Sequence, residues 1–221
     1  MKSDSLSRKL SILVIPAALL LAPLVAKAEG PTRLNSMNVL TQVRDASCNP
    51  ADQTAGMITS ATPLNTLLYE FLECHPVLAP DGHQLTLAEF KAAQGIVSAK
   101  CIGQGTHSVI HFSGLVPNGT YTVWLFIFGN GGPPINATAV GALGKSNPIQ
   151  NFFTASATGE GELSVTTPEG PLSAFGNVGA CWLDAYPQVH LAVVYHIDGQ
   201  THGPGPGPGG TWVFQAAFVF L

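Results

Sequence analysis

The stretch at 106–130, THSVIHFSGLVPNGTYTVWLFIFGN, constrains the fold more than any other part of this chain. Its first part is predicted to be a strand, in which successive side chains point to opposite faces, so that Ile110 and Phe112 would share one face. Pro-Asn-Gly at 117–119 is typical of a tight turn, because Pro presets φ and Asn and Gly tolerate positive φ. The segment at 121–128 is almost wholly apolar, which predicts a second strand buried on both faces.

Further short strands are predicted on both sides of this hairpin, separated by turn-forming residues. We expect strands at 96–102, 106–115, 120–129, 150–156, 161–166, 188–197 and 211–220. Seven short strands with turns between them favour an all-β fold, a two-sheet antiparallel β-sandwich of the immunoglobulin or fibronectin-III kind.

Tyr121 follows the pattern Leu115-x-Pro117-x-Gly119 at the start of its strand. The pattern resembles the tyrosine corner of immunoglobulin-like sandwiches, in which the Tyr hydroxyl bonds to backbone a few residues upstream. This resemblance implies a structural role for Tyr121.

Residues 1–28 have the features of a secretory signal peptide. Basic residues precede an apolar run at 10–25, and Ala26-Lys27-Ala28 is a small-x-small cleavage site. The run is too short and too soon followed by a processing site to span a membrane. We therefore expect a secreted or periplasmic protein, soluble after cleavage near Ala28, with no membrane insertion.

The charge of the remaining chain argues against nucleic-acid binding. Removal of residues 1–28 reduces 9 basic and 13 acidic residues to 5 and 12, a net charge of −7. So acidic a chain without a Lys/Arg cluster has no electrostatic footprint for nucleic acid or an anionic membrane.

The segment at 29–84 reads as an N-terminal extension to a β-sandwich domain at 85–221. Apolar residues at 64, 67, 68, 71 and 72 form a helical stripe, with Asn65 as N-cap, so this extension is predicted to hold a short helix. A second short helix is predicted at 87–94, because Thr86 and Glu89 form a capping-box pattern and Gly95 can end the helix.

Four cysteines in an exported chain predict two disulfides, with three possible pairings. We favour Cys48–Cys74 and Cys101–Cys181, since the second would join two parts of one β-domain. Their spacing does not match a zinc site, so their predicted role is structural.

The segment at 189–202 contains the best candidate metal ligands. On a strand, His190, His196 and Asp198 would share one face, and His202 follows a turn that could bring it back toward His196. Imidazole and carboxylate suit copper or zinc. His190 and His196 are about 20 Å apart on an extended strand, however, so one metal could contact both only if the strand bends. An alternative is that these histidines bond to backbone or line a half-exposed face.

Two catalytic interpretations receive less support. The hairpin is similar to a stretch of copper/zinc superoxide dismutase, but Trp124 and Phe126 stand where that family has copper ligands, so we expect no such activity and a structural role for Trp124. No G-x-S-x-G pattern is present and the cysteines are expected to be oxidised, which leaves only an unspecified hydrolase as an enzymatic alternative.

Two motifs are similar to those of an uncharacterised group of secreted bacterial all-β proteins: GLxPNGxYTxW at 114–124 and YHxDGxTHGP at 195–204. This resemblance implies export and a β-sandwich, and it assigns no catalytic residues. The leading expectation is thus a non-enzymatic binding or structural module that binds an unknown extracellular ligand or protein through long loops at 130–149, 167–180 and 199–210. A copper- or zinc-binding protein is the first alternative.

Overall fold

A computed structural model describes residues 32–39, 42–129 and 137–221, and these form a mostly β protein. One large antiparallel sheet contains β1 (Thr32–Val39), β4 (Gln94–Ile102), β5 (Gly105–Ser113), β6 (Thr120–Phe128), β7 (Ala139–Ala142), β8 (Phe152–Thr154), β9 (Gly161–Pro168), β12 (Gln188–His196) and β13 (Trp212–Phe220). The strand order is β7-β6-β12-β13-β1-β4-β5-β9, and β8 pairs with β6. The smaller elements are β2 (Val43–Arg44), β3 (Tyr69–Glu70), β10 (Gly170–Pro171), β11 (Asn177–Val178), α1 (Leu87–Lys91) and α2 (Trp182–Ala185).

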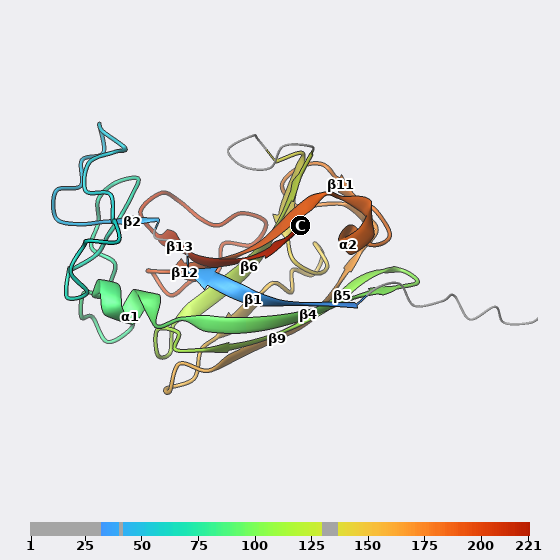
Figure 1. Cartoon of the computed structure of the whole chain (residues 1–221), viewed down its shortest axis with the longest axis horizontal. Coiled ribbons are helices and arrows are strands. Elements are labelled where there is room, and N and C mark those ends of the chain that lie inside the picture. Colours follow the sequence, from blue (N-terminus) through green and yellow to red (C-terminus); the bar gives the residue numbers. More distant parts are fainter. Residues whose placement is uncertain (1–31, 40–41, 130–136) are drawn as a thin grey trace, which may run out of the picture.

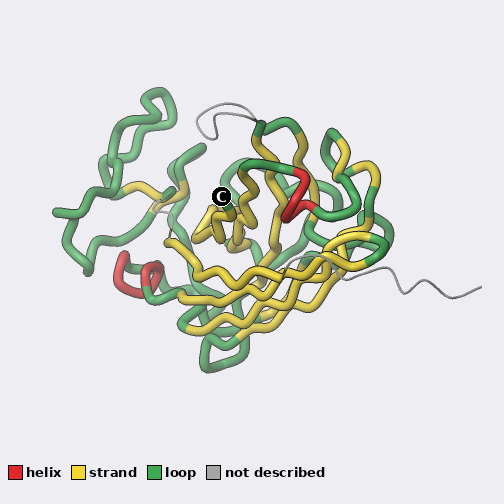
Figure 2. Tube along the Cα trace, turned by 45° about the vertical axis from the view of Figure 1, so that its right-hand side comes forward, coloured by secondary structure: helices red, strands yellow, loops and turns green. Residues whose placement is uncertain are grey.

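Strand β1 joins the two halves of this sheet (Figure 1). Its residues 32–36 pair with β4, and its residues 37–39 pair with β13. The sheet curls, so that its halves enclose the main apolar core (Figure 2). Phe112 of β5 packs against Phe218 of β13, with ring centroids 6.0 Å apart, which places side chains of both halves in one core.

The prediction that residues 121–128 are buried on both faces is confirmed. Val123, Leu125 and Ile127 of β6 point into the main core. Trp124 of the same strand belongs to a second buried cluster, with Ala142, Ala192 and Val194. Side chains alternate along a strand, so the second cluster lies on the outer face of the sheet, where loops cover it.

The all-β prediction is confirmed, and all seven predicted strands are present. The strands form one continuous hydrogen-bonded sheet that folds over itself, where two separate sheets were expected. Two strands were not predicted from the sequence: β1, which lies within the segment assigned to the N-terminal extension, and β7.

The helix predicted from the stripe at 64–72 is wrong. Leu68 instead donates its N–H to the carbonyl of Leu85 and accepts from the N–H of Val77, a pattern of extended pairing. The buried carboxylate of Glu70 accepts hydrogen bonds from three backbone N–H groups at 72, 73 and 75, which stabilises a turn there. The stripe failed because Leu64 and Leu67 stay exposed, so no helical face is buried.

The second predicted helix is present as α1, and the capping box between Thr86 and Glu89 is confirmed. It ends at Lys91, three residues before the predicted end, because β4 begins at Gln94. Gly95 therefore lies in a strand and does not end the helix.

The two disulfides join Cys48 to Cys74 and Cys101 to Cys181, the favoured pairing. Residues 1–28, to which the signal peptide was assigned, lie outside the described residues. No helix in the described part of the chain is long and apolar enough to cross a membrane.

Candidate functional site

His196, Asp198 and His202 form a compact group at the end of β12 and in the turn that follows. Each offers one potential metal-ligand atom, and these atoms all lie within 4.8 Å of one another. Nε2 of His202 lies 2.8 Å from Oδ2 of Asp198. The ring centroids of the two histidines are 6.0 Å apart. The fold thus brings together three of the four ligands that the sequence predicted.

The turn after β12 holds Asp198 in place through its backbone. Strand pairing extends to Ile197, whose N–H donates to the carbonyl of Thr211. Gly199 then adopts a φ of +70° and donates its N–H to the carbonyl of His196. Oδ1 of Asp198 accepts from the N–H of Gln200, which leaves Oδ2 directed to His202.

Gly207 in the Pro-Gly segment fixes the other side of His202. A Cβ atom at this position would lie less than 3 Å from three atoms of the His202 ring. The φ of Gly207 is +109°, which favours glycine for a second reason. Its carbonyl accepts from Nε1–H of Trp212, the strand partner of His196. The alternating Pro-Gly segment therefore packs directly against the site at His202.

His196 differs from the other two residues in its burial. Its side chain is 1% exposed, while those of Asp198 and His202 are about a quarter exposed. Burial lowers the pKa of His196 to about 4, so that the imidazole is neutral at neutral pH. Its Nε2 is hydrogen-bonded to Oγ1 of Thr122 at 2.8 Å. Its Nδ1 is buried and has no hydrogen-bond partner among the described residues.

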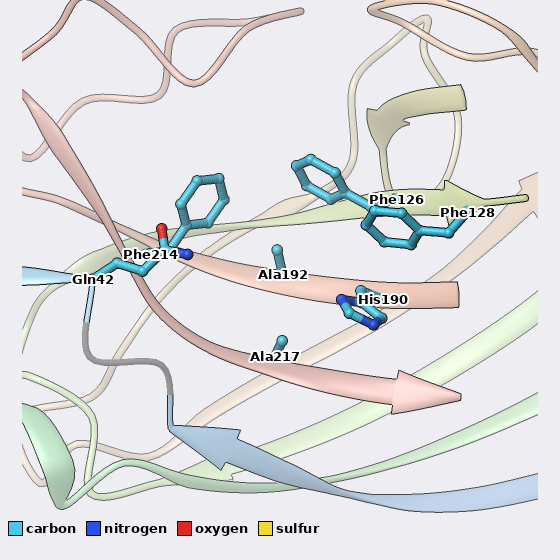
Figure 3. A pocket seen from close by; sticks show the side chains of 7 residues that line it. All are labelled: Gln42, Phe126, Phe128, His190, Ala192, Phe214 and Ala217. Carbon is cyan, nitrogen blue, oxygen red and sulfur yellow. The ribbon is translucent and has the colours of Figure 1, made fainter. Parts of the chain in front are cut away.

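His190, the fourth predicted ligand, does not join the group, as its distance along β12 had suggested. Figure 3 shows it beside Phe128 on the outer face of the sheet. Together with Phe126 and Phe214 it lines a hollow of about 270 Å³. Nε2 of His190 is 2.8 Å from Nε2 of Gln188, and burial lowers the pKa of His190. Its role here is to line an apolar surface.

Two further histidines, His107 and His111, lie on β5. Nδ1 of His107 is 3.1 Å from Oγ1 of Thr166, and Nδ1 of His111 is 3.7 Å from a Glu162 carboxylate oxygen. Both belong to the opposite half of the sheet from β12. Neither contributes to the group at 196–202.

The cysteines do not form a metal site. Cys101 and Cys181 lie close to Asp184, in an arrangement that resembles a ligand set. Their sulfur atoms are bonded to each other, however, so no thiolate is available as a ligand.

The two predicted structural residues are buried as expected. The Tyr121 hydroxyl accepts a hydrogen bond from the backbone N–H of Val116, five residues upstream, which is the contact predicted for a tyrosine corner. Trp124 donates its Nε1–H to Oγ1 of Thr122.

Thr122 is the residue of the site that sequence analysis missed. It lies on β6, opposite Val194 and thus diagonal to His196 across the strand pair. A single hydroxyl between Tyr121 and the run VWLFIF was the available signal. A buried hydroxyl needs a partner, and its partner comes from a strand 74 residues away.

Parts of all three long loops meet over the outer face of β6. Val140, Ala174 and the segment at 204–206 surround an apolar hollow of about 100 Å³, together with Trp124. Apart from Trp124, these residues belong to the loops through which ligand binding was expected, and the structure describes only part of those loops. This arrangement brings the Pro-Gly segment over Trp124.

Comparison with known proteins adds no assignment: no protein-family model matches this chain, and no curated protein matches it.

Proposed function

We propose that this chain is an exported, disulfide-braced protein that binds a divalent transition metal, zinc or copper, through His196, Asp198 and His202. The proposal is carried by the grouping of His196 with two other potential ligands, together with its buried Nδ1, which has no hydrogen-bond partner among the described residues. Buried polar atoms in proteins nearly always have a partner. A metal ion would be a partner for this one.

The donor set supports the choice of metal. Two imidazole nitrogens and one carboxylate oxygen suit zinc and copper better than calcium or magnesium, which prefer oxygen ligands. Ligand atoms on a tetrahedral zinc, at bonds of about 2.0–2.2 Å, lie roughly 3.3–3.6 Å apart. The ligand atoms of Asp198 and His202, 2.8 Å apart, would have to separate to this spacing, and the metal would replace the proton shared between them.

The electrostatics favour binding near neutral pH. A metal ligand must be unprotonated, and burial keeps His196 neutral down to a pKa of about 4. Three protein ligands leave a fourth position for water or another small ligand. The proposed function is binding, and we assign no reaction to it.

Export is part of the proposal. It is supported by the signal-peptide pattern at 1–28 and by the two disulfides, which persist in oxidising compartments. N/O sites of this kind bind both zinc and copper, and the experiment below determines which of the two metals this protein binds.

The test is metal content and metal affinity of the oxidised protein from residue 29 onward. We expect one zinc or copper ion per chain, and a rise in melting temperature when that metal is added to chelator-treated protein. His196→Ala and His202→Ala should both abolish the rise. His190→Ala is the matched control, because it removes a histidine from the same strand face but outside the group.

Two results would contradict the proposal. One is the absence of bound metal together with no thermal shift for either ion. The other is an equal loss of binding in His190→Ala, which would place the metal elsewhere.

A further inference from the structure

Trp124, Thr122 and His196 form a buried chain of two hydrogen bonds behind the proposed metal site. Nε1 of Trp124 lies 2.9 Å from Oγ1 of Thr122, and that oxygen lies 2.8 Å from Nε2 of His196. All three side chains are at most 3% exposed. Because these side chains are shielded from solvent, their donors and acceptors have to be satisfied by one another.

The donors available on these three side chains restrict the directions of the two hydrogen bonds. Indole Nε1–H can only donate, so Thr122 Oγ1 accepts from Trp124. The hydroxyl hydrogen of Thr122 is then free to donate, and among the described residues its only acceptor is Nε2 of His196. In that arrangement Nε2 carries no proton, and the neutral imidazole carries its proton on Nδ1.

A metal on Nδ1 requires the opposite tautomer. Nδ1 must offer its lone pair, and the proton must lie on Nε2. The Thr122 oxygen has two lone pairs, one of which is used by Trp124, so it can accept the Nε2–H with the other. The hydroxyl hydrogen then turns away from the imidazole. The imidazole stays neutral, with one proton lost from Nδ1 and one gained on Nε2.

We propose that Thr122 is an outer-sphere positioning residue that supports the metal-binding tautomer of His196, with Trp124 fixing the direction of its lone pair. The inference rests on the proposed metal site. It assigns Thr122 the part that a carboxylate or carbonyl plays behind many metal-bound histidines, which is to accept the proton of the second ring nitrogen.

Thr122→Val removes the acceptor and preserves the shape of the side chain. Nε2–H would then be buried without a partner, so the metal-bound form is disfavoured. Loss of such an outer-sphere partner typically weakens metal binding 10–100-fold, and we expect this range for zinc. Thr122→Ser keeps the hydroxyl and should restore an affinity close to that of the natural protein. Trp124→Phe should give a smaller loss.

The opposite half of the sheet offers a matched control. Thr166 and His107 form a similar Thr–His pair, with Oγ1 and Nδ1 3.1 Å apart. Thr166→Val removes the same kind of contact outside the site and should leave zinc affinity unchanged. A general effect of Thr→Val on a β-strand would appear in both variants.

The experiment combines zinc titration of these variants with ¹⁵N NMR of the His196 ring. In chelator-treated protein we expect the proton on Nδ1, and in zinc-loaded protein we expect it on Nε2. Thr122→Val should lose the preference for Nδ1–H in the metal-free state, a change that a merely structural role would not produce.

The possible failures can be told apart. Absence of zinc binding by the unsubstituted protein would overturn the site itself. Equal zinc affinity of Thr122→Val and the unsubstituted protein, or a zinc-loaded tautomer with the proton on Nδ1, would overturn the role of Thr122 and leave the site intact. A loss that Thr122→Ser fails to restore would also overturn that role.

Discussion

Acidification should destabilise this protein through His196, and the size of the effect follows from its burial. An unfolded histidine has a pKa near 6.5, while burial lowers that of folded His196 to about 4. Between these pH values the unfolded chain binds a proton that the folded chain excludes. The free energy of unfolding therefore falls as pH drops through this window, and the contribution is complete above about pH 6.5. At about 1.4 kcal/mol for each pH unit, the loss is roughly 3 kcal/mol by pH 4.

The measurement is urea unfolding of the oxidised protein in chelator at several pH values, for the unsubstituted chain and for His196→Gln. The difference between their pH dependences isolates His196, since both share the other titrating groups. His190→Gln is the comparison. Its effect on the pH dependence of the unfolding free energy should have the same sign as that of His196→Gln and be smaller, because His190 is less buried. Parallel pH profiles for the unsubstituted and His196→Gln proteins would refute the reasoning.

Four further changes should lower stability. Replacing Cys101 and Cys181 by Ala opens a loop of 80 residues and should cost about 4–5 kcal/mol of unfolding free energy, whereas loss of the other disulfide, which closes 26 residues, should cost about 3.5 kcal/mol; urea unfolding measures both. Tyr121→Phe leaves the buried N–H of Val116 without its acceptor, and we expect a loss of about 1–3 kcal/mol in the same assay. Gly207→Ala should cost about 1–3 kcal/mol through backbone strain and also weaken zinc binding, because the new methyl group displaces the imidazole packed on it.

The substitutions at Tyr121 and Gly207 each have a comparison within the chain. Gly205→Ala should be nearly neutral, since nothing lies within 4 Å of the added Cβ, so an equal effect at 205 and 207 would contradict the proposed contact. Tyr195→Phe removes a donor to the carbonyl of Leu78 and should cost less than Tyr121→Phe, because a carbonyl left unpaired has a second lone pair. A larger effect at Tyr195 would argue against the tyrosine corner.

Local sequence patterns predicted those features that depend on nearby residues. The turn at 117–119 and the capping box at Thr86 each form from residues within a few positions of one another. The alternation around Ile110 is also a local pattern, and it agrees with the pairing of that strand with β4 and β9. The hydrogen bond of Tyr121 likewise spans five residues. Such contacts survive in the fold because no long-range pairing competes with them.

Patterns failed where long-range pairing competed with local preference. The stripe at 64–72 is compatible with a helix, but Leu68 pairs with Leu85 and the adjacent turn is stabilised by Glu70. Strand β1 carries a weak pattern, and its place between β4 and β13 depends on partners more than 50 residues away. A propensity of a few tenths of a kcal/mol per residue is small compared with the burial and pairing that tertiary contacts supply.

The candidate site combines both kinds of information. The four-residue spacing of Asp198 and His202, with Gly199 at positive φ between them, is a local property that can be read from the chain. The burial of His196, its bond to Thr122 and the exclusion of His190 depend on the pairing of β12 with β6 and on the folding of the Pro-Gly segment over the turn. The sequence by itself determines which side-chain atoms could bind a metal. Only the tertiary structure determines which of these atoms are buried, because burial depends on the surrounding strands and loops.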